Sequence, residues 1–392
     1  MPDRHADRPY DVVLFGATGF TGRLTAEYLA RNAPADCRWA LAGRNRAKLE
    51  QVRSDLAQIE PGCADLPLLH ADATEPASLR AVAEQARVVA SAVGPYLEHG
   101  EPLVAACAES GTDYADLTGE PEFVDRMYLA HHARAVETGA RLVHACGFDS
   151  VPHDLGVWFT LGQLPTGVPV RIRGLVRSNA AFSGGTFASA LTAMSRGRQM
   201  KQASSARRRV EPRPEGRRVR TTAGRPHRDP VTGFWLVPLP TIDPLVVKRS
   251  AAALEAYGPD FTYAHYAAVR RLPTVLAGVG GVGALAVAAQ VGPLRRTLMR
   301  RVPQGEGPSP ERRARSFFSV RFVAEAAGTT VQTQVSGGDP GYDETAKMLA
   351  ESALCLALDD NPPSAGQVTT AVAMGDQLLE RLQKAGLRFE VL

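Results

Sequence analysis

A glycine-rich turn near the start of the chain constrains the fold more than any other feature. The apolar run YDVVLF at 10–15 leads directly into the turn, and a helical pattern follows it. The first glycine permits a tight turn, the second lets the backbone approach a pyrophosphate, and the third lets helix and strand pack closely. The helix start adds N–H groups and the positive end of its dipole. A bare glycine triplet would also fit a turn in another α/β protein, but its place between a strand and a helix favours a dinucleotide site. The predicted cofactor contacts here are Gly16, Thr18, Gly19, Phe20, Thr21 and Gly22.

Short β-branched runs alternate with helical stretches through the first 150 residues. This βαβ rhythm predicts a doubly wound parallel sheet with helices on both faces, a Rossmann domain over 1–150. The expected strands are 10–15, 38–42, 66–70, 88–92, 113–115 and 141–145, and the expected helices are 20–33, 45–58, 76–85, 100–110 and 121–139.

The rhythm stops after residue 160, and short strands rich in Pro and Gly follow it. We therefore predict an α/β fold in which a second, mixed α+β domain for substrate binding or oligomerisation covers 151–362. Two strands around Ala327-Gly328 are expected to form a hairpin, and 342–358 a helix. The final segment, 363–392, is expected to contain one helix over 366–386 that returns to the first domain.

The end of the second strand indicates which nicotinamide cofactor is bound. An acid at this position accepts the ribose 2′-hydroxyl of NAD, whereas an arginine accommodates the 2′-phosphate of NADP. Here the strand ends in Gly43-Arg44-Asn45-Arg46, without an acid. A solvated Arg44 that only caps the next helix is the alternative, but the pattern favours NADP(H). Asp72, after the third strand, is expected either to meet the adenine or to cap the helix near Pro76.

Three loops at the carboxyl ends of the strands are expected to border the nicotinamide and the substrate. The first contains Val93, Gly94 and Pro95, which we predict to contact the cofactor. The candidate proton donors on the three loops are Tyr96, Tyr114, Asp116, Asp149 and His153, of which we favour Tyr96, Tyr114 and Asp149. The alternatives stay open: a buried tyrosine is usually a core residue, and Asp149 or Ser150 would cap a helix beginning near His153.

The composition excludes several other classes of protein. The five cysteines of the 392 residues show no metal-ligand spacing, so we expect no metal site and reduced thiols in a cytoplasmic protein. The polar residues 1–9 do not resemble a signal peptide. No tyrosine is followed by lysine at the Tyr-x-x-x-Lys spacing of short-chain reductases.

Two segments have unusual patterns. Residues 196–228 contain twelve Lys or Arg and two Glu, which predicts an exposed, mobile basic loop, either merely solvated or facing an acidic partner. No nucleic-acid motif accompanies this charge, so nucleic acid is not expected. The apolar run 274–294 is Gly- and Ala-rich, which disfavours a transmembrane span. A buried helix, a homodimer contact and a peripheral membrane contact remain open for it.

Motifs spread over nearly the whole chain resemble the saccharopine dehydrogenase-like family, and within it the actinobacterial trans-acting enoyl reductases. They are GATGFTG at 16–22, LAGR at 41–44, VGPY at 93–96, GTDYADLTGE at 111–120, ACGFDSVPHDLG at 145–156, SGGTFASAL at 183–191, GEGPS at 305–309, SGGDPGYDETAKMLAESALCLAL at 336–358 and AMGDQLLERL at 373–382.

The resemblance implies an NADPH-dependent oxidoreductase that reduces a C=C bond of an acyl or polyketide chain, carried by a polyketide synthase or acyl carrier protein, in lipid or glycolipid assembly. In such a reaction hydride goes to the β-carbon of an enoyl thioester, a donor stabilises the enolate oxygen, and the α-carbon is protonated. A saccharopine-type amine or imine dehydrogenase is one alternative. A non-catalytic NADP(H)-binding sensor or lipid-surface protein is the other.

Overall fold

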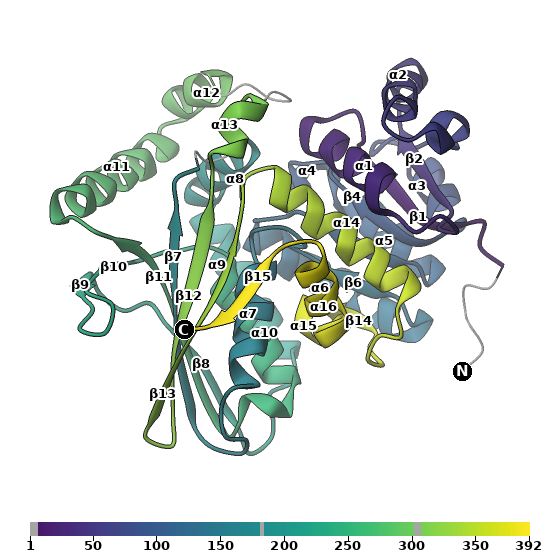
Figure 1. Cartoon of the computed structure of the whole chain (residues 1–392). Helices are drawn as coiled ribbons and strands as arrows, with labels where there is room; N and C mark the ends of the chain where they lie inside the picture. Colours follow the sequence, from purple (N-terminus) through teal and green to yellow (C-terminus); the bar gives the residue numbers. More distant parts are fainter. Residues whose placement is uncertain (1–6, 181–183, 302–306) are drawn as a thin grey trace.

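The structure, a computed structural model, describes residues 7–180, 184–301 and 307–392. Within these residues the first sheet has seven parallel strands (Figure 1). In spatial order they are β14 (Gly366–Val368), β6 (Arg141–Val143), β5 (Asp113–Asp116), β4 (Ala86–Ser91), β1 (Tyr10–Phe15), β2 (Trp39–Gly43) and β3 (Leu68–His70). The predicted doubly wound parallel sheet is confirmed.

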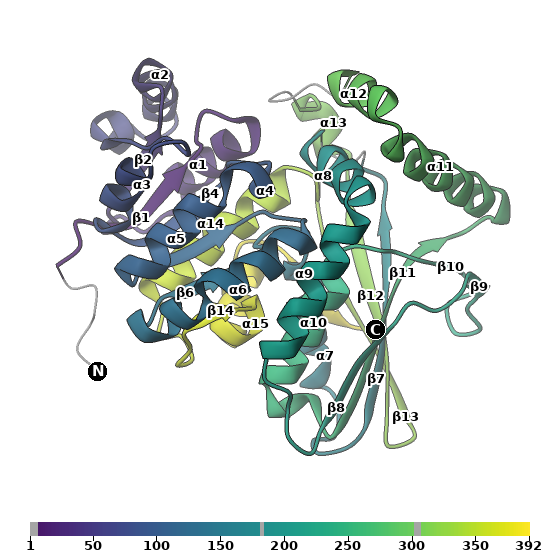
Figure 2. The same ribbon diagram turned by 180° about the vertical axis from the view of Figure 1, so that it is seen from behind.

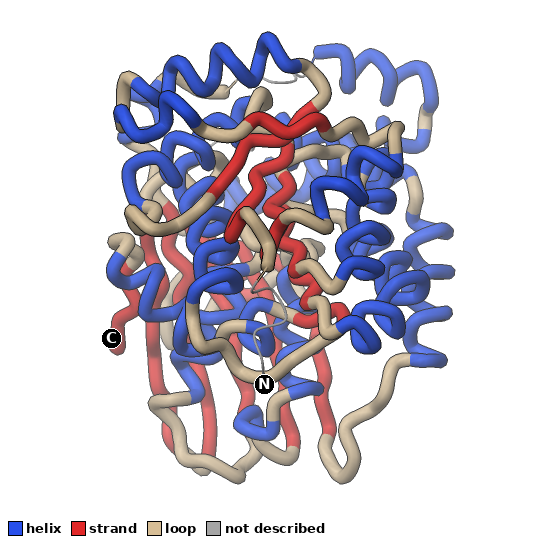
Figure 3. The backbone as a smooth tube through the Cα atoms, turned by 90° about the vertical axis from the view of Figure 1, so that its right-hand side faces the viewer, coloured by secondary structure: helices blue, strands red, loops and turns tan. Residues whose placement is uncertain are grey.

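Alternate residues of β1 face opposite sides of the first sheet, as strand geometry requires. Val12 and Leu14 belong to the apolar core on one side, and Val13 and Phe15 to the core on the other. Helices cover both faces, and a side view shows the strands running between them (Figure 3). The helices of this region are α1 (Phe20–Asn32), α2 (Arg46–Ala57), α3 (Pro76–Ala83), α4 (Tyr96–His99), α5 (Glu101–Ser110) and α6 (Pro121–Thr138), with a 3-10 turn at Pro61–Asp65.

The second sheet is mixed and, in the described residues, contains eight strands. Along its main path lie β15 (Arg388–Val391), β13 (Thr329–Gly337), β12 (Phe318–Ala326), β7 (Val170–Ser178), β11 (Asp260–Val269), β10 (Trp235–Pro238) and β9 (His227–Arg228), while β8 (Arg218–Thr222) pairs with β11. The predicted hairpin around Ala327-Gly328 is confirmed. Strands β12 and β13 pair along their whole length, from Ala326 opposite Thr329 beside the turn to Phe318 opposite Gly337.

Further helices follow α6 in the chain, and most of them lie between the two sheets or on the second one (Figure 2). They are α7 (Val151–Leu161), α8 (Gly184–Ser195), α9 (Gly197–Val210), α10 (Asp243–Ala253), α11 (Leu272–Gln290), α12 (Gly292–Arg301), α13 (Pro310–Ala314) and α14 (Asp343–Leu358), with a 3-10 turn at Glu255–Tyr257. Helix α14, from a segment that the sequence groups with the second domain, packs on α1 and on the first sheet.

The prediction of one helix over 366–386 is wrong. Strand β14 pairs with β6 in the first sheet, two helices follow, and β15 then pairs with β13 in the second sheet. The helices are α15 (Thr370–Ala373) and α16 (Gly375–Lys384). Gly375 has a φ of +47°, which interrupts a regular helix at this point. The end of the chain therefore ties the two sheets together.

The prediction of a mobile basic loop over 196–228 is also wrong, because α9 occupies its first part. Arg207 on α9 is only 3% exposed. Its guanidinium lies 3.3 Å from the Asp125 carboxylate, 2.8 Å from Gln367 and 4.0 Å from the Tyr128 ring centre. Arg249 of α10 also pairs with Asp125. A buried cation needs such partners, and these lie in sequence far from α9.

We expect Asp125→Asn to destabilise the protein by about 2 kcal/mol, because the buried Arg207 and the partly buried Arg249 lose one of the two carboxylates that they share, the other being Glu211. Urea unfolding followed by circular dichroism measures this change. Glu50→Gln is the matched control: Glu50 pairs with Arg46 at 3.0 Å, but both are exposed, so the change should be about 0–0.5 kcal/mol. Equal losses in both variants would contradict a structural role for the buried group.

Candidate functional site

The glycine loop forms a cradle that side chains would fill. Gly16 has a φ of +97°, and a Cβ placed on it would lie 2.6 Å from Val93 Cγ2. A Cβ on Gly22 would lie 2.1 Å from the Gly16 carbonyl oxygen. Both positions therefore require glycine, as the sequence predicts for a tight turn and for close helix packing.

The second glycine of the loop stands at the start of α1. Gly19 is exposed beside Thr18, and a Cβ on it would meet its nearest atom only at 3.5 Å. No side chain caps the helix at Gly19. The N–H groups of the first turn, from Phe20, Thr21 and Gly22, thus belong to a helix start that can receive phosphate oxygens.

The end of β2 places an arginine where the adenosine ribose is expected. Arg44 is exposed, while Asn45 caps α2 by accepting a hydrogen bond from the Lys48 N–H at 3.0 Å. Arg44 therefore does not serve as the helix cap. Asp72 accepts hydrogen bonds from the Thr74 N–H and hydroxyl, which lower its pKa, and the charge of Arg44 adds to this effect.

The alternative role of Asp72 as a helix cap is wrong, because Glu75 is the residue that precedes α3. Asp72 and Arg44 instead lie within electrostatic range of each other, after β3 and β2. The glycine cradle, the uncapped helix and this exposed arginine fit a dinucleotide that carries a 2′-phosphate.

A segment near the second sheet lies against the phosphate loop. The Phe20 ring makes an edge contact with Tyr342 at 4.9 Å between ring centres, and the Arg313 guanidinium lies 5.5 Å from the Phe20 ring centre. Gly307 also touches the ring, because a Cβ there would lie 2.2 Å from Phe20 Cε1. Of the motif GEGPS at 305–309, the first two residues lie outside the described part of the chain, and the rest lies at this contact.

The loop after β4 is held by hydrogen bonds that involve Tyr96. The Tyr96 hydroxyl donates to the Ser91 carbonyl oxygen at 3.0 Å and accepts from the Leu117 N–H at 3.1 Å. Glu120 accepts from the Tyr96 and Leu97 N–H groups at 3.3 and 2.9 Å. Val93 contacts Gly16, and the following Gly94–Pro95 peptide is cis. These bonds join the loops after β4 and β5.

Tyr114 and Asp116 lie inside the protein. Tyr114 is fully buried in the apolar core, and burial raises its pKa well above the usual value for tyrosine. Asp116 accepts hydrogen bonds from the Thr118 and Ala145 N–H groups, both at 3.0 Å, and its other oxygen lies 2.7 Å from His144 Nδ1. This packing favours structural roles for both residues.

Asp149 differs from the other candidates because its side chain is only half-buried. Its Oδ2 lies against Gly119, where a Cβ would come within 3.1 Å. Burial raises the pKa of Asp149 to about 7, and the negative charge of Asp243 contributes, while His153 acts in the opposite direction. Helix α7 begins after Ser150, whose side chain makes no capping bond. Asp149 is therefore partly protonated near neutral pH, in a loop at the carboxyl edge of the first sheet.

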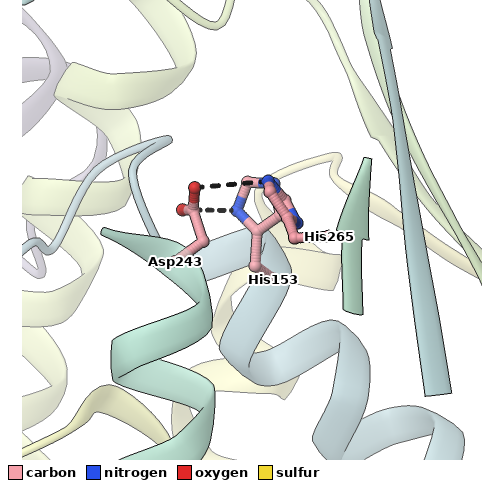
Figure 4. A group of neighbouring side chains, drawn as sticks. All are labelled: His153, Asp243 and His265. Carbon is pink, nitrogen blue, oxygen red and sulfur yellow. Dashed lines mark ion pairs between the residues drawn. The ribbon is translucent and has the colours of Figure 1, made fainter. Parts of the chain in front are cut away.

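Three buried side chains, His153, Asp243 and His265, form a group (Figure 4), and the charges of Asp243 and His153 act on Asp149. His153 Nδ1 lies 3.0 Å from one Asp243 oxygen, and His265 Nε2 lies 3.4 Å from the other. Burial lowers the pKa of His265 to about 4. Although burial opposes it, the two imidazoles lower the pKa of Asp243 below its usual value. The cluster places a fixed negative charge within range of Asp149.

The sequence indicated only His153 of these three. Asp243 begins α10 and His265 lies in β11, so both come from parts of the chain remote from the motif at 145–156. No local spacing could have identified them.

The same donor set, two imidazoles and a carboxylate with ligand atoms within 4.8 Å of one another, is one that Zn²⁺ accepts. Both Asp243 oxygens already face the imidazoles, so we interpret the three side chains as a buried polar network. The expected absence of a metal stays a prediction.

Comparison with known proteins agrees with this geometry. Residues 12–143 match the saccharopine dehydrogenase NADP binding domain family. A putative trans-acting enoyl reductase of Mycobacterium tuberculosis is 41% identical, covering 98% of this chain and 97% of that protein. A trans-acting enoyl reductase of Mycobacterium bovis is 38% identical, covering 97% of each.

Among solved structures, the apo saccharopine dehydrogenase (L-Glu forming) of Saccharomyces cerevisiae is similar in fold. Its TM-score is 0.58 at 12% identity, covering 97% of this chain and 99% of that one. Residues 12–143 therefore form an NADP(H)-binding domain of the saccharopine dehydrogenase type.

Proposed function

This chain belongs to the trans-acting enoyl reductase family and is an NADPH-dependent oxidoreductase, and on that premise we propose that it reduces the C=C bond of a carrier-bound enoyl thioester. The observation that carries the proposal is Asp149, a half-buried carboxyl whose pKa is raised to about 7 beside the carboxyl ends of β5 and β6. Reduction of an enoyl thioester requires a proton donor there, and this group has the protonation state of one.

The strand order supports the position of this acid. From β2, where Arg44 meets the adenosine, the sheet runs through β1 and β4 to β5 and β6. A dinucleotide that extends across the strand ends from Arg44 over the glycine loop brings its nicotinamide toward the last of these strands. Asp149 and Gly119 lie in the loops that follow them.

Different residues of the chain have different roles in the proposed reaction. The cofactor, when bound, supplies a hydride to the β-carbon of the substrate. Asp149 holds the proton that the α-carbon then accepts, and Asp243 keeps that proton on Asp149 through its negative charge. His153 and His265 fix the orientation of Asp243, since each imidazole faces one of its oxygens.

The acyl chain is proposed to arrive on an acidic carrier domain of a polyketide synthase, in lipid or glycolipid assembly. The names of the relatives support a partner that acts in trans. Basic side chains that stay exposed on α9 and the segment after it give such a partner a complementary surface. They are Arg198, Lys201, Arg208, Arg209 and Arg213.

Oxidation of NADPH in the presence of crotonyl thioesters, free and carrier-bound, tests the function. We expect turnover with the enoyl thioester, and faster turnover on the carrier. Oxidation with an imine but not with any enoyl thioester would instead support a saccharopine-type dehydrogenase. Tight NADPH binding without turnover of either substrate class would support a sensor.

We expect Arg44→Ala to weaken NADPH binding by about 10- to 100-fold, because a charged hydrogen bond to the 2′-phosphate contributes about 1.5–3 kcal/mol. NADH binding should change little. Quenching of tryptophan fluorescence measures both dissociation constants. Arg31→Ala, which removes a half-exposed arginine from the far end of α1, is the control. An equal loss for both cofactors would show that Arg44 does not contact the 2′-phosphate.

A further inference from the structure

Helix α11 lies at the outer edge of the second sheet, away from the first sheet (Figures 1 and 2). One side of it is held by the protein: Val275 and Ala289 are buried, and the Gln290 side chain donates to the Met194 carbonyl oxygen of α8 at 2.6 Å. The other side is uncovered. Leu276 and Val287 are 66% and 68% exposed, the highest values among the exposed large apolar residues of the described chain.

Glycines make α11 unusual. A Cβ on any of four of them would meet no described atom within 4 Å; they are Gly278, Gly280, Gly281 and Gly283. Exposed glycines weaken a helix, and exposed apolar side chains in this number normally mark a surface that is covered in use. The exposed apolar surface continues past the helix end to Val291 and Leu294.

The sequence around α11 carries positive charge only. Residues 261–305 include six arginines and no acidic residue, and 272–294 have no charge at all. The arginines stand at both ends of the apolar stretch: 270 and 271 precede it, and 295, 296, 300 and 301 follow it. An acid-free apolar segment between basic ends is complementary in charge to the negatively charged surface of a membrane.

Arg177 of β7 and Arg321 of β12 lie on neighbouring paired strands and line the same small pocket, and Arg270 stands between β11 and the start of α11. Arg177 of β7 has its pKa lowered by burial, and further by the charges of Arg270 and Arg321. Among the described residues none of the three forms an ion pair with a carboxylate. Like charges that gather without a counter-ion are unfavourable, and anionic ligands would relieve their repulsion.

A second copy of this chain is a poor occupant of the surface. A two-fold dimer through α11 would bring its basic ends together in either helix direction. No acidic residue of 261–305 could neutralise them. None of the helices over the described residues is long and apolar enough to cross a membrane.

We propose that α11, together with Arg177, Arg270 and Arg321, is a surface that binds the headgroup region of an anionic lipid bilayer. The exposed apolar side of the helix enters the boundary between headgroups and acyl chains, and the arginines contact lipid phosphates. This inference is independent of the reaction proposed above, because it involves neither the cofactor cradle nor Asp149.

Co-sedimentation with phosphatidylcholine vesicles, with and without phosphatidylglycerol, tests the proposal. We expect binding to the anionic vesicles, about tenfold or more tighter than to neutral ones, and loss of binding at high salt. The double variant Leu276→Asp/Val287→Asp should bind at least about tenfold more weakly, since two apolar contacts are replaced by charges. Arg270→Ala/Arg321→Ala should weaken only the phosphatidylglycerol-dependent part.

Val231→Asp is the matched control, because Val231 is also exposed but lies in the turn between β9 and β10. Quenching by NADPH should be the same in all variants and shows that each is folded. Absence of vesicle binding by the wild-type chain overturns the proposal. A dimer in light scattering that Leu276→Asp/Val287→Asp dissociates, without vesicle binding, would assign α11 to self-association. Loss of carrier-protein binding alone in that variant would assign it to a protein partner.

Discussion

Asp149→Asn lowers kcat for enoyl thioester reduction by about 10²- to 10⁴-fold, the usual contribution of a positioned general acid. The substitution removes the carboxyl proton but keeps the size and polar character of the side chain. The dissociation constant for NADPH should hardly change, because Asp149 lies in the loop after β6, whereas the phosphate loop follows β1. Stopped-flow measurement of NADPH oxidation under single-turnover conditions separates this loss from product release.

The pH profile distinguishes an acid from a structural residue. Burial raises the pKa of Asp149 to about 7, so the protonated form dominates below that pH and disappears above it. The wild-type rate should therefore fall as the pH rises above about 7, by about tenfold per unit while one proton is being lost. In the Asn variant this fall should be absent. Asp360→Asn, at an exposed position, is the control and should keep the wild-type profile.

Persistence of the alkaline fall in Asp149→Asn would contradict the assignment, because another group would then carry the proton. His153→Asn offers a second comparison. It removes one of the imidazoles that face Asp243, so it should alter the position of the fall without abolishing it. If His153→Asn changed only the stability of the protein, the pH at which the rate falls would stay the same.

Local patterns in the sequence predicted the first sheet and the cofactor. The site residues that the sequence did not predict are brought together by contacts between segments that are remote in sequence. The glycine loop and Arg44 act within a few residues of their own strands, so spacing was sufficient. Asp243 and His265 meet His153 only after α10 has packed against both α7 and β11. Asp125 and Arg207 are likewise 82 residues apart in sequence. A charge pattern alone made α9 look solvated, because Asp125 and Gln367, which contact Arg207 together with Glu211 at the end of α9, are remote in sequence.

Local patterns were also insufficient to predict the structure of the last segment, 363–392. An amphipathic pattern over 366–386 indicated a single helix, whereas the structure has helix at 370–373 and 375–384, and whether Gly366–Val368 forms a strand depends on the free edge of β6. The pattern could not reveal that edge. Tyr96 and Tyr114 show the converse, because their residue type suited a proton donor. Only the fold shows that two hydrogen bonds hold the Tyr96 hydroxyl and that Tyr114 is fully buried.

Gly22→Ala and Gly19→Ala should both abolish tight NADPH binding, but for different reasons. At Gly22 the new methyl group would lie 2.1 Å from the Gly16 carbonyl oxygen and 2.8 Å from its carbon. Backbone cannot rotate away as a side chain can, so α1 must move from β1. We expect a destabilisation of about 1–3 kcal/mol, as for an overfilled core. NADPH binding should weaken by about 100-fold or more, because the helix start that receives the phosphates moves with α1.

At Gly19 the methyl group fits the protein, since its nearest atom is 3.5 Å away and the φ is −83°. Stability should therefore stay within about 0.5 kcal/mol of wild type. NADPH binding should nevertheless fall, because the methyl group projects where the pyrophosphate approaches the backbone. Urea unfolding and fluorescence quenching together separate the two effects. Gly197→Ala, which meets no atom within 4 Å, is the control for both measurements. Wild-type NADPH affinity in Gly19→Ala would mean that the pyrophosphate does not approach the loop at Gly19, and the cofactor would then have to be held by the helix start and Arg44 alone.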